Sequence, residues 1–320
     1  MRIGIIGTNF ISDWFVAAAR QTYGRVDPVA VYSRTAERAQ EFAQKHDIPQ
    51  AYDDYEAMLA NVDAVYIASP TFAHFSQAMT AIEAGRHVLV EKTMTASVAE
   101  AEALFAAAEE RGVVAMEATR HLHTPAYALL AGTLDQLGPL RYAHFEKLQY
   151  SSRYDRFRAG EHLNAFDPSL GNSALADIGV YCLEPALDLF GIPRHTSGTS
   201  IRLDNGFEAG GSLQLDYATM IVDVVYSKIA SGVGPCTIIG EKGIVTVNDL
   251  AEPCRIVVQK RGEDPVVLLD TDPVTPGEAM SYELEAFADQ VEAEQIDLRW
   301  RDVTIASRRI MDEQLARTGT

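Results

Sequence analysis

The stretch Arg2-Ile3-Gly4-Ile5-Ile6, followed at once by Gly7-Thr8-Asn9-Phe10-Ile11-Ser12, decides the fold of this chain. It has the pattern of an apolar strand, a turn of small residues and the start of a helix. Such a unit opens a dinucleotide-binding fold, because the free N–H groups and partial positive charge of the helix N-terminus attract a pyrophosphate. Of the three glycines in the usual fingerprint only Gly7 is present, with Asn9 and Ser12 at the other positions. Taken alone, the pattern fits an ordinary strand-to-helix turn equally well.

The next hundred residues repeat this alternation of strand and helix. Strands are expected at 28–32, 64–68, 88–90 and 113–116, and helices at 36–45, 72–84 and 96–111. Regular alternation predicts a parallel sheet with helices on both faces, and ligands then lie at the carboxyl ends of the strands. Four such ends carry polar or glycine-containing turns: Gly7, Ser33-Arg34, Ser69-Pro70-Thr71 and Lys92.

Glu91-Lys92 closes the buried strand at 87–90. Removing a lysine ammonium from water costs several kcal/mol or shifts its pKa, so a lysine at such a position is expected to be paired or used. We therefore regard Lys92 as a candidate functional residue.

After about residue 120 the pattern changes to short alternating segments at 140–150, 201–240, 244–247 and 254–259. These predict a mostly antiparallel sheet with one face covered, accompanied by helices at 172–190, 281–293 and 303–316. The sequence thus indicates an α/β domain over 1–120 that binds a dinucleotide. A second, α+β domain is expected over 121–320.

Composition excludes several classes of function. The chain has 320 residues, 47% of them hydrophobic, and a net charge of −18, which disfavours nucleic acid and acidic membrane surfaces as partners. No secretion signal precedes the first strand, so we expect a cytoplasmic location. Cys182, Cys236 and Cys254 lack metal-site spacing and are expected to be reduced, and no metal site is predicted.

Taken together, the motifs resemble the Gfo/Idh/MocA oxidoreductases over essentially the whole chain. The branch with tyrosine at the end of the Asp-x-Gly-x-x motif, which includes glucose-fructose oxidoreductases and dimeric dihydrodiol dehydrogenases, is the most similar. The resemblance implies a small-molecule substrate and a homodimer or homotetramer formed through the open face of the second sheet. The segments that carry the resemblance, in chain order, are Gly7 to Ser12, Ser33-Arg34, Ser69 to His74, Glu91-Lys92, Met116-Glu117-Ala118 and Asp177-Ile178-Gly179-Val180-Tyr181.

Within this resemblance, Lys92, Asp177 and Tyr181 are the catalytic candidates. Asp177 and Tyr181 are four residues apart on an expected helix and share a face, which in the family looks toward the nicotinamide. A tyrosine is a weak base unaided, and a nearby ammonium favours its ionised form. We expect Tyr181 to act as acid and base, Lys92 to orient the substrate oxygen and tune the tyrosine, and Asp177 to bind a substrate hydroxyl. The alternative is that Asp177 and Tyr181 are an ordinary pair on a helix surface, with the ring of Tyr181 packed in the core.

The cofactor preference follows from the residues after the second strand. A hydroxyl followed by arginine suits a ribose 2′-phosphate, whereas an acid there suits a free ribose diol. Ser33-Arg34 therefore favours NADP(H), with NAD(H) remaining possible. His74 is expected either to line the cofactor site or to bond to the backbone near a helix start. The candidate cofactor-binding residues are Gly7, Thr8, Asn9, Phe10, Ile11, Ser33, Arg34, Ser69, Pro70, His74, Glu91 and Lys92.

The chain departs from the family pattern at two further places. Thr93 follows the lysine where the family has proline, and a peptide bond without proline disfavours the cis form. Leu122 occupies the position of a family arginine, while Arg120, His121 and His123 crowd the same segment. These three residues are expected either to shape a substrate pocket or to cap a helix that begins near Pro125.

Two other functions fit the same fold. A cofactor-sensing regulator needs the nucleotide site but no proton relay, so the combination of Lys92, Asp177 and Tyr181 argues against it. A glycosidase that uses a tightly held nicotinamide for transient oxidation would retain its cofactor without net reduction. We predict an oxidoreductase that transfers hydride between a nicotinamide and a secondary alcohol or carbonyl of a sugar, polyol or dihydrodiol. A methyltransferase is disfavoured, because Ser33-Arg34 replaces the acid that would bind its ribose.

Overall fold

The structure is a computed structural model that describes residues 1–317, and it divides into two compact units. The first contains Met1–His123 together with Thr275–Ile305. The second contains Thr124–Val274 and residues 306–317. The division expected at 120/121 is close to the first of these boundaries but does not include the later return of Thr275–Ile305 to the first unit.

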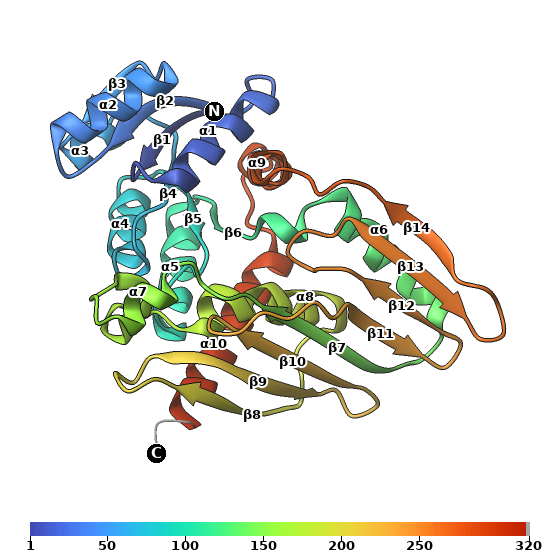
Figure 1. The fold of residues 1–320 in the computed structure, drawn as a ribbon. Coiled ribbons are helices and arrows are strands. Elements are labelled where there is room, and N and C mark those ends of the chain that lie inside the picture. Colours follow the sequence, from blue (N-terminus) through green and yellow to red (C-terminus); the bar gives the residue numbers. More distant parts are fainter. Residues whose placement is uncertain (318–320) are drawn as a thin grey trace. The chain divides into compact units, whose positions relative to one another are not determined.

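The first unit has the expected parallel sheet, with strand order β3-β2-β1-β4-β5-β6 (Figure 1). This is the doubly wound order, in which the chain reverses direction across the sheet between β1 and β4. The strands are β1 (Arg2–Ile6), β2 (Asp27–Tyr32), β3 (Gln50–Tyr52), β4 (Ala64–Ile67), β5 (His87–Glu91) and β6 (Ala115–Ala118). The helices are α1 (Phe10–Gln21), α2 (Ala36–His46), α3 (Tyr55–Leu59), α4 (Thr71–Glu83) and α5 (Val98–Arg111).

Two hydrophobic cores hold this sheet, one on each face. Every residue of β4 is buried, as a parallel strand covered on both sides requires. Ala64 and Tyr66 belong to one core, which includes Phe15 of α1. Val65 and Ile67 belong to the other, which includes Leu104 of α5.

Helix α9 (Pro276–Glu292) belongs to the first unit, although it was expected in the second domain. It packs against α1, and its Met280, Leu284 and Phe287 lie in the same hydrophobic core as the α1 side chains. At the ends of the two helices, Arg25 forms ion pairs with carboxylates of α9, including that of Asp289 at 2.7 Å. This apolar face explains why the chain returns to the first unit after residue 274.

The second unit is built on an eight-stranded sheet, mostly antiparallel as expected, with strand order β14-β13-β12-β11-β7-β10-β9-β8 (Figure 1). Strands β7 and β10 pair in parallel, whereas the other neighbours are antiparallel. The strands are β7 (Leu140–Leu148), β8 (His195–Arg202), β9 (Glu208–Asp216), β10 (Ile221–Ser227), β11 (Cys236–Gly240), β12 (Gly243–Val247), β13 (Arg255–Lys260) and β14 (Val266–Asp270).

One face of this sheet is covered. Helix α8 (Val180–Phe190) packs on β7 and β10, where Phe145, Val222 and Val224 are fully buried. The remaining helices of the unit are α6 (Pro125–Thr133), α7 (Tyr154–Arg158) and the part of α10 (Leu298–Arg317) that follows Ile305. Among residues 1–317, no helix combines the length and apolar character needed to span a membrane.

Candidate active site

The turn after β1 passes very close to the end of β4. Gly7 has a φ of +104°, and a Cβ at this position would lie 2.8 Å from the carbonyl oxygen of Ala68. Its own N–H donates to the carbonyl of Tyr32 at the end of β2 (3.2 Å). Only glycine fits this place, because the backbone geometry and the contact distance both exclude a side chain.

The two residues that replace glycines of the fingerprint, Asn9 and Ser12, both stabilise this turn. The side chain of Asn9 caps α1 by accepting from the Ile11 N–H (2.9 Å), and its amide donates to the Ala68 carbonyl (2.8 Å). Ser12 donates its hydroxyl to the Gly7 carbonyl (3.0 Å). Asn9 therefore ties the turn to β4.

The turn keeps backbone donors for a ligand. Within residues 1–317 the N–H groups of Thr8, Asn9 and Phe10 make no hydrogen bond to the protein. They lie at the N-terminus of a twelve-residue helix, whose dipole favours an anion. A pyrophosphate fits this glycine cradle and its donors.

Ser33 and Arg34 follow β2 at the neighbouring strand end. The Ser33 N–H donates to the Tyr52 carbonyl at the end of β3 (3.1 Å), which fixes the backbone of this turn. The Arg34 side chain is exposed. No carboxylate of the described chain forms an ion pair with Arg34, so its guanidinium is available to a ligand.

The third strand end contains Ser69, Pro70 and His74. Pro70 precedes α4, and the Ser69 hydroxyl donates to the side chain of Gln77 (2.7 Å). His74 is buried, with its ring nitrogens 2.7 Å from the Ser69 carbonyl and 3.1 Å from the Thr93 carbonyl. Burial lowers the pKa of His74. Of the two roles considered for His74, these contacts match the backbone-bonded one, and they join the ends of β4 and β5.

Lys92 leaves the end of β5, and its peptide bond to Thr93 is cis despite the absence of proline. The following residues are fixed by buried contacts, because the Met94 N–H donates to Glu117 Oε1 (2.7 Å). Glu91 accepts a hydrogen bond from the Tyr66 hydroxyl (2.6 Å). Burial raises the pKa of Glu91, against the opposing effects of that hydrogen bond and the nearby charges of Lys92 and Arg120.

Arg120 and His121 lie in a short 3₁₀ helix, η1 (Arg120–Leu122), and His123 follows it directly. The Arg120 charge acts on Glu91 and on Glu283 of α9, while His121 is buried. The ring of His123 packs on Trp300, with centroids 4.5 Å apart. The capping alternative for these residues is wrong, because Thr124 caps the helix that begins at Pro125 by accepting from the Tyr127 N–H (3.2 Å).

Glu283 is a buried acid that the sequence analysis did not single out. Its side chain is 1% exposed, and neither carboxyl oxygen has a hydrogen-bond partner within residues 1–317. Burial raises the pKa of Glu283 well above its usual range, and Glu91 adds to this effect while Arg120 opposes it. Burial therefore favours the neutral, protonated form of Glu283.

This protonation makes stability depend on pH. Because the folded-state pKa of Glu283 is raised, its contribution is complete below the unfolded pKa and is lost as pH rises toward the folded value. We expect Glu283→Gln, which stays neutral, to reduce the fall in unfolding free energy as the pH rises above the unfolded pKa of a glutamate, about 4.3. Urea denaturation at several pH values measures this, with Glu278→Gln in the same helix as the control. An unchanged pH dependence in Glu283→Gln would contradict it.

In the second unit, Asp177 lies in a π-helical turn, η5 (Leu175–Gly179), that leads directly into α8. The helix begins at Ala174 instead of the expected residue 172. Glu208 of β9 accepts from the Leu175 N–H (3.0 Å), and a Cβ on Gly179 would lie 2.9 Å from the Tyr226 ring. The turn is thus fixed to the sheet beneath it, and π-helical turns often occur at functional sites.

Asp177 and Tyr181 are near each other in sequence and differ in exposure. Asp177 is exposed between buried neighbours, and Tyr181 is half-buried. The carboxylate of Asp177 forms an ion pair with Lys228 (2.8 Å), a lysine that the sequence analysis missed. A signal for it was present, because Val222, Val224, Tyr226 and Lys228 are spaced by two and so fall on the covered face of the sheet.

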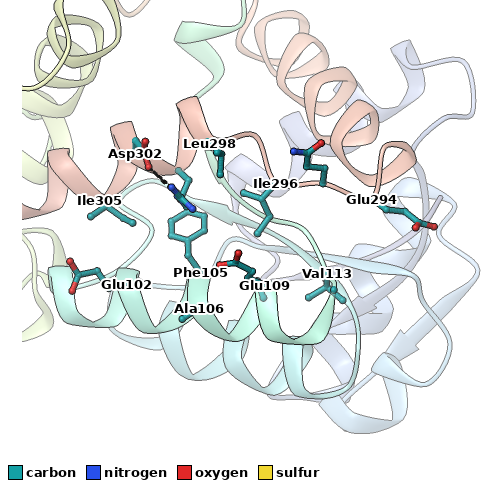
Figure 2. A pocket seen from close by; sticks show the side chains of 14 residues that line it. Glu102, Phe105, Ala106, Glu109, Val113, Glu294, Ile296, Leu298, Asp302 and Ile305 are labelled. Carbon is teal, nitrogen blue, oxygen red and sulfur yellow. Dashed lines mark hydrogen bonds and ion pairs between the residues drawn. The ribbon is translucent and has the colours of Figure 1, made fainter.

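A hollow of about 530 Å³ in the first unit lies between α5 and the segment 294–305. Figure 2 shows the carboxylates of Glu102, Glu109 and Asp302 around the apolar side chains of Phe105 and Ile296. None of the candidate cofactor or catalytic residues lines this hollow. We assign it no role in the reaction.

Comparison with known proteins agrees with a dinucleotide-binding fold in the first part of the chain. Residues 1–119 match the family model described as "Oxidoreductase family, NAD-binding Rossmann fold". The scyllo-inositol 2-dehydrogenase (NADP(+)) of Bacillus subtilis is 36% identical over 100% of this chain and 97% of its own length. The trans-1,2-dihydrobenzene-1,2-diol dehydrogenase of Macaca fascicularis is 32% identical over 88% of this chain and 86% of its own.

Solved structures show the same fold. The 3-ketoreductase KijD10 of Actinomadura kijaniata, in complex with NADP and TDP-benzene, has a TM-score of 0.84 at 24% identity, with 98% of this chain and 96% of that chain covered. A levoglucosan dehydrogenase has a TM-score of 0.86 at 19% identity, with coverages of 99% and 97%.

A doubly wound sheet with a glycine turn and free N–H donors at its switch point is the architecture of a dinucleotide-binding domain. The chain belongs to the Gfo/Idh/MocA family, and it is an NAD(P)-dependent dehydrogenase or reductase.

Proposed function

We propose that this protein transfers hydride between NADP(H) and a secondary alcohol or carbonyl group of a sugar, polyol or dihydrodiol. The observation that carries the NADP(H) preference is the exposed Arg34 beside Ser33, at the strand end where enzymes that select NAD(H) place an acid. The inositol and dihydrodiol dehydrogenases among the relatives support the substrate class.

In this proposal the chain performs binding and proton transfer. The N–H groups of residues 8–10 bind the pyrophosphate, and Arg34 binds the 2′-phosphate. When bound, the nicotinamide would supply the hydride acceptor for the alcohol carbon, or the hydride donor for the carbonyl carbon. Tyr181 takes the hydroxyl proton as the C–H bond breaks, Lys92 orients the oxygen, and Asp177 binds a neighbouring hydroxyl.

The proposal extends to assembly and location. The uncovered face of the eight-stranded sheet would join two copies of the chain, giving a homodimer or homotetramer. Light scattering coupled to gel filtration tests the oligomeric state. We further propose a cytoplasmic location, in keeping with three free cysteines, Cys182, Cys236 and Cys254.

Arg34→Ala tests the cofactor preference. The unmutated protein is expected to bind NADPH more tightly than NADH, and the variant to lose most of the difference, because a charge-assisted hydrogen bond contributes about 1.5–3 kcal/mol. Calorimetry with both cofactors measures this. Arg111→Ala, which removes an exposed arginine at the end of α5, is the control and should keep the preference. Equal or tighter NADH binding by the unmutated protein would contradict the assignment.

A substrate screen tests the reaction itself. Inositols, sugars and trans-dihydrodiols are incubated with NADP⁺ or NAD⁺, and cofactor reduction is followed by absorbance at 340 nm. We expect NADP⁺ reduction with at least one polyol or dihydrodiol. Bound cofactor that survives gel filtration, together with glycoside cleavage and no net reduction, would favour the glycosidase. Cofactor binding without any turnover would favour a regulator.

A further inference from the structure

Lys228 is a buried cation directly after β10. Its side chain is 5% exposed, whereas that of its ion-pair partner Asp177 is 48% exposed. The ammonium also donates to the carbonyl oxygen of Ala165 (3.0 Å). It lies 5.0 Å from the centre of the Phe166 ring and 5.4 Å from that of Phe207.

These contacts compensate for the removal of the ammonium from water. A buried charge is costly unless it is paired and hydrogen-bonded, and aromatic ring faces attract cations. Here a carboxylate, a carbonyl and two rings surround one nitrogen. The position of Lys228 is therefore fixed by these four groups, and the more exposed Asp177 is the member of the pair that solvent or a ligand can reach.

The same contacts join three segments of the second unit. Ala165 and Phe166 belong to a short 3₁₀ helix, η3 (Asn164–Phe166), and Phe207 precedes β9. Phe166, Phe207 and Ala209 form a small hydrophobic core on which Tyr154 and Phe157 pack. Lys228 connects this core to the π-helical turn that contains Asp177.

We propose that Lys228 is a positioning residue that holds the carboxylate of Asp177 ionised and oriented to accept a hydrogen bond from a substrate hydroxyl. An ionised carboxylate only accepts, so it selects a hydroxyl that donates, and a fixed orientation lowers the entropy cost of substrate binding. This inference rests on the proposed function, in which Asp177 binds the substrate.

The test is a double-mutant cycle with Lys228→Met, Asp177→Asn and the double variant. Steady-state kinetics gives kcat and KM for the substrate found in the screen, together with KM for the nicotinamide cofactor. We expect Lys228→Met to raise the substrate KM about tenfold or more, the size expected for a hydrogen bond to a charged group, and to leave the cofactor KM unchanged. In the Asp177→Asn background the same substitution should change the substrate KM less than about twofold.

Lys147→Met is the matched control. Lys147 forms an ion pair with Asp249 in the same unit, and its side chain is 18% exposed. This variant should keep the kinetic constants of the unmutated protein while it loses a comparable ion pair. If it raised the substrate KM as much as Lys228→Met does, the effect would reflect general loss of stability, and the role of Lys228 would be wrong.

Lys228→Gln keeps the proposal testable if Lys228→Met does not fold, because glutamine retains a donor and removes the charge. Its substrate KM should lie between those of the unmutated protein and Asp177→Asn, and in the Asp177→Asn background it should have no further effect. If Lys228→Gln raised the substrate KM by the same factor with and without Asp177→Asn, the role of Lys228 would be wrong, whereas the proposed reaction would stand. Absence of turnover by the unmutated protein would overturn the proposed function, and this role with it.

Discussion

Lys92→Met and Tyr181→Phe are each expected to lower turnover by roughly a hundredfold or more, which is the usual contribution of a positioned acid or base. Neither residue lies in the turn proposed to bind the pyrophosphate, so the fold and the phosphate contacts should be retained and cofactor affinity should change little beyond any contact of Lys92 with the nicotinamide ribose. Single-turnover measurements of cofactor reduction, together with calorimetric titration of NADPH, separate the two quantities.

The controls for these variants are Lys45→Met and Tyr142→Phe. Lys45 forms an exposed ion pair with Asp13 on the first unit, and Tyr142 donates to Asp223 on the second sheet. Both should retain near-normal turnover. If Lys92→Met and Tyr181→Phe did the same, the relay would be wrong, and His121 or His123 would become the candidate acid.

Gly7→Ala is expected to reduce both stability and NADPH affinity strongly. A non-glycine residue at this positive φ costs about 1–3 kcal/mol. The new Cβ would also lie 2.8 Å from the Ala68 carbonyl oxygen, so the turn must shift away from β4. We expect the turn to lose its donors for the pyrophosphate, with NADPH affinity falling at least about tenfold.

Gly24→Ala isolates the contribution of the contact. Gly24 has a φ of +90°, and nothing lies within 4 Å of a Cβ placed there. The loss of unfolding free energy in Gly24→Ala therefore measures only the cost of a non-glycine backbone at positive φ. The difference between the two variants, from urea denaturation, gives the cost of the collision with Ala68. Equal losses in the two variants, with unchanged NADPH affinity in Gly7→Ala, would contradict this account.

The sheet of the first unit was predictable, because its strands and helices are long enough to show their periodicity. β3 and α3 were missed, because a strand of three residues and a helix of five residues each contain less than two periods of their own pattern. The early start of α9 had a local signal: Thr275 caps the helix and Pro276 occupies its first position.

The candidate site divides in a similar way. The chemical identity of residues at strand ends is visible in the sequence, so a nucleotide site at the carboxyl ends of the first sheet could be proposed without a structure. Contacts between residues far apart in the chain could not be read from the sequence. The charge of Arg120 acts on Glu283, and Lys228 pairs with Asp177. The π-helical turn likewise depends on Tyr226 and Glu208 of neighbouring strands. Periodicity reports which face is buried, but it does not report which charge lies opposite.

The return of Thr275–Ile305 to the first unit has a consequence for synthesis. Residues 1–123 leave the ribosome before α9 does, so at that stage their core lacks Met280, Leu284 and Phe287. Until α9 emerges, the apolar face of α1 stays open to solvent or to chaperones. The unit that begins the chain is therefore completed only after nearly all of the second unit has been translated, and a fragment cut after residue 123 would expose the surface that α9 covers.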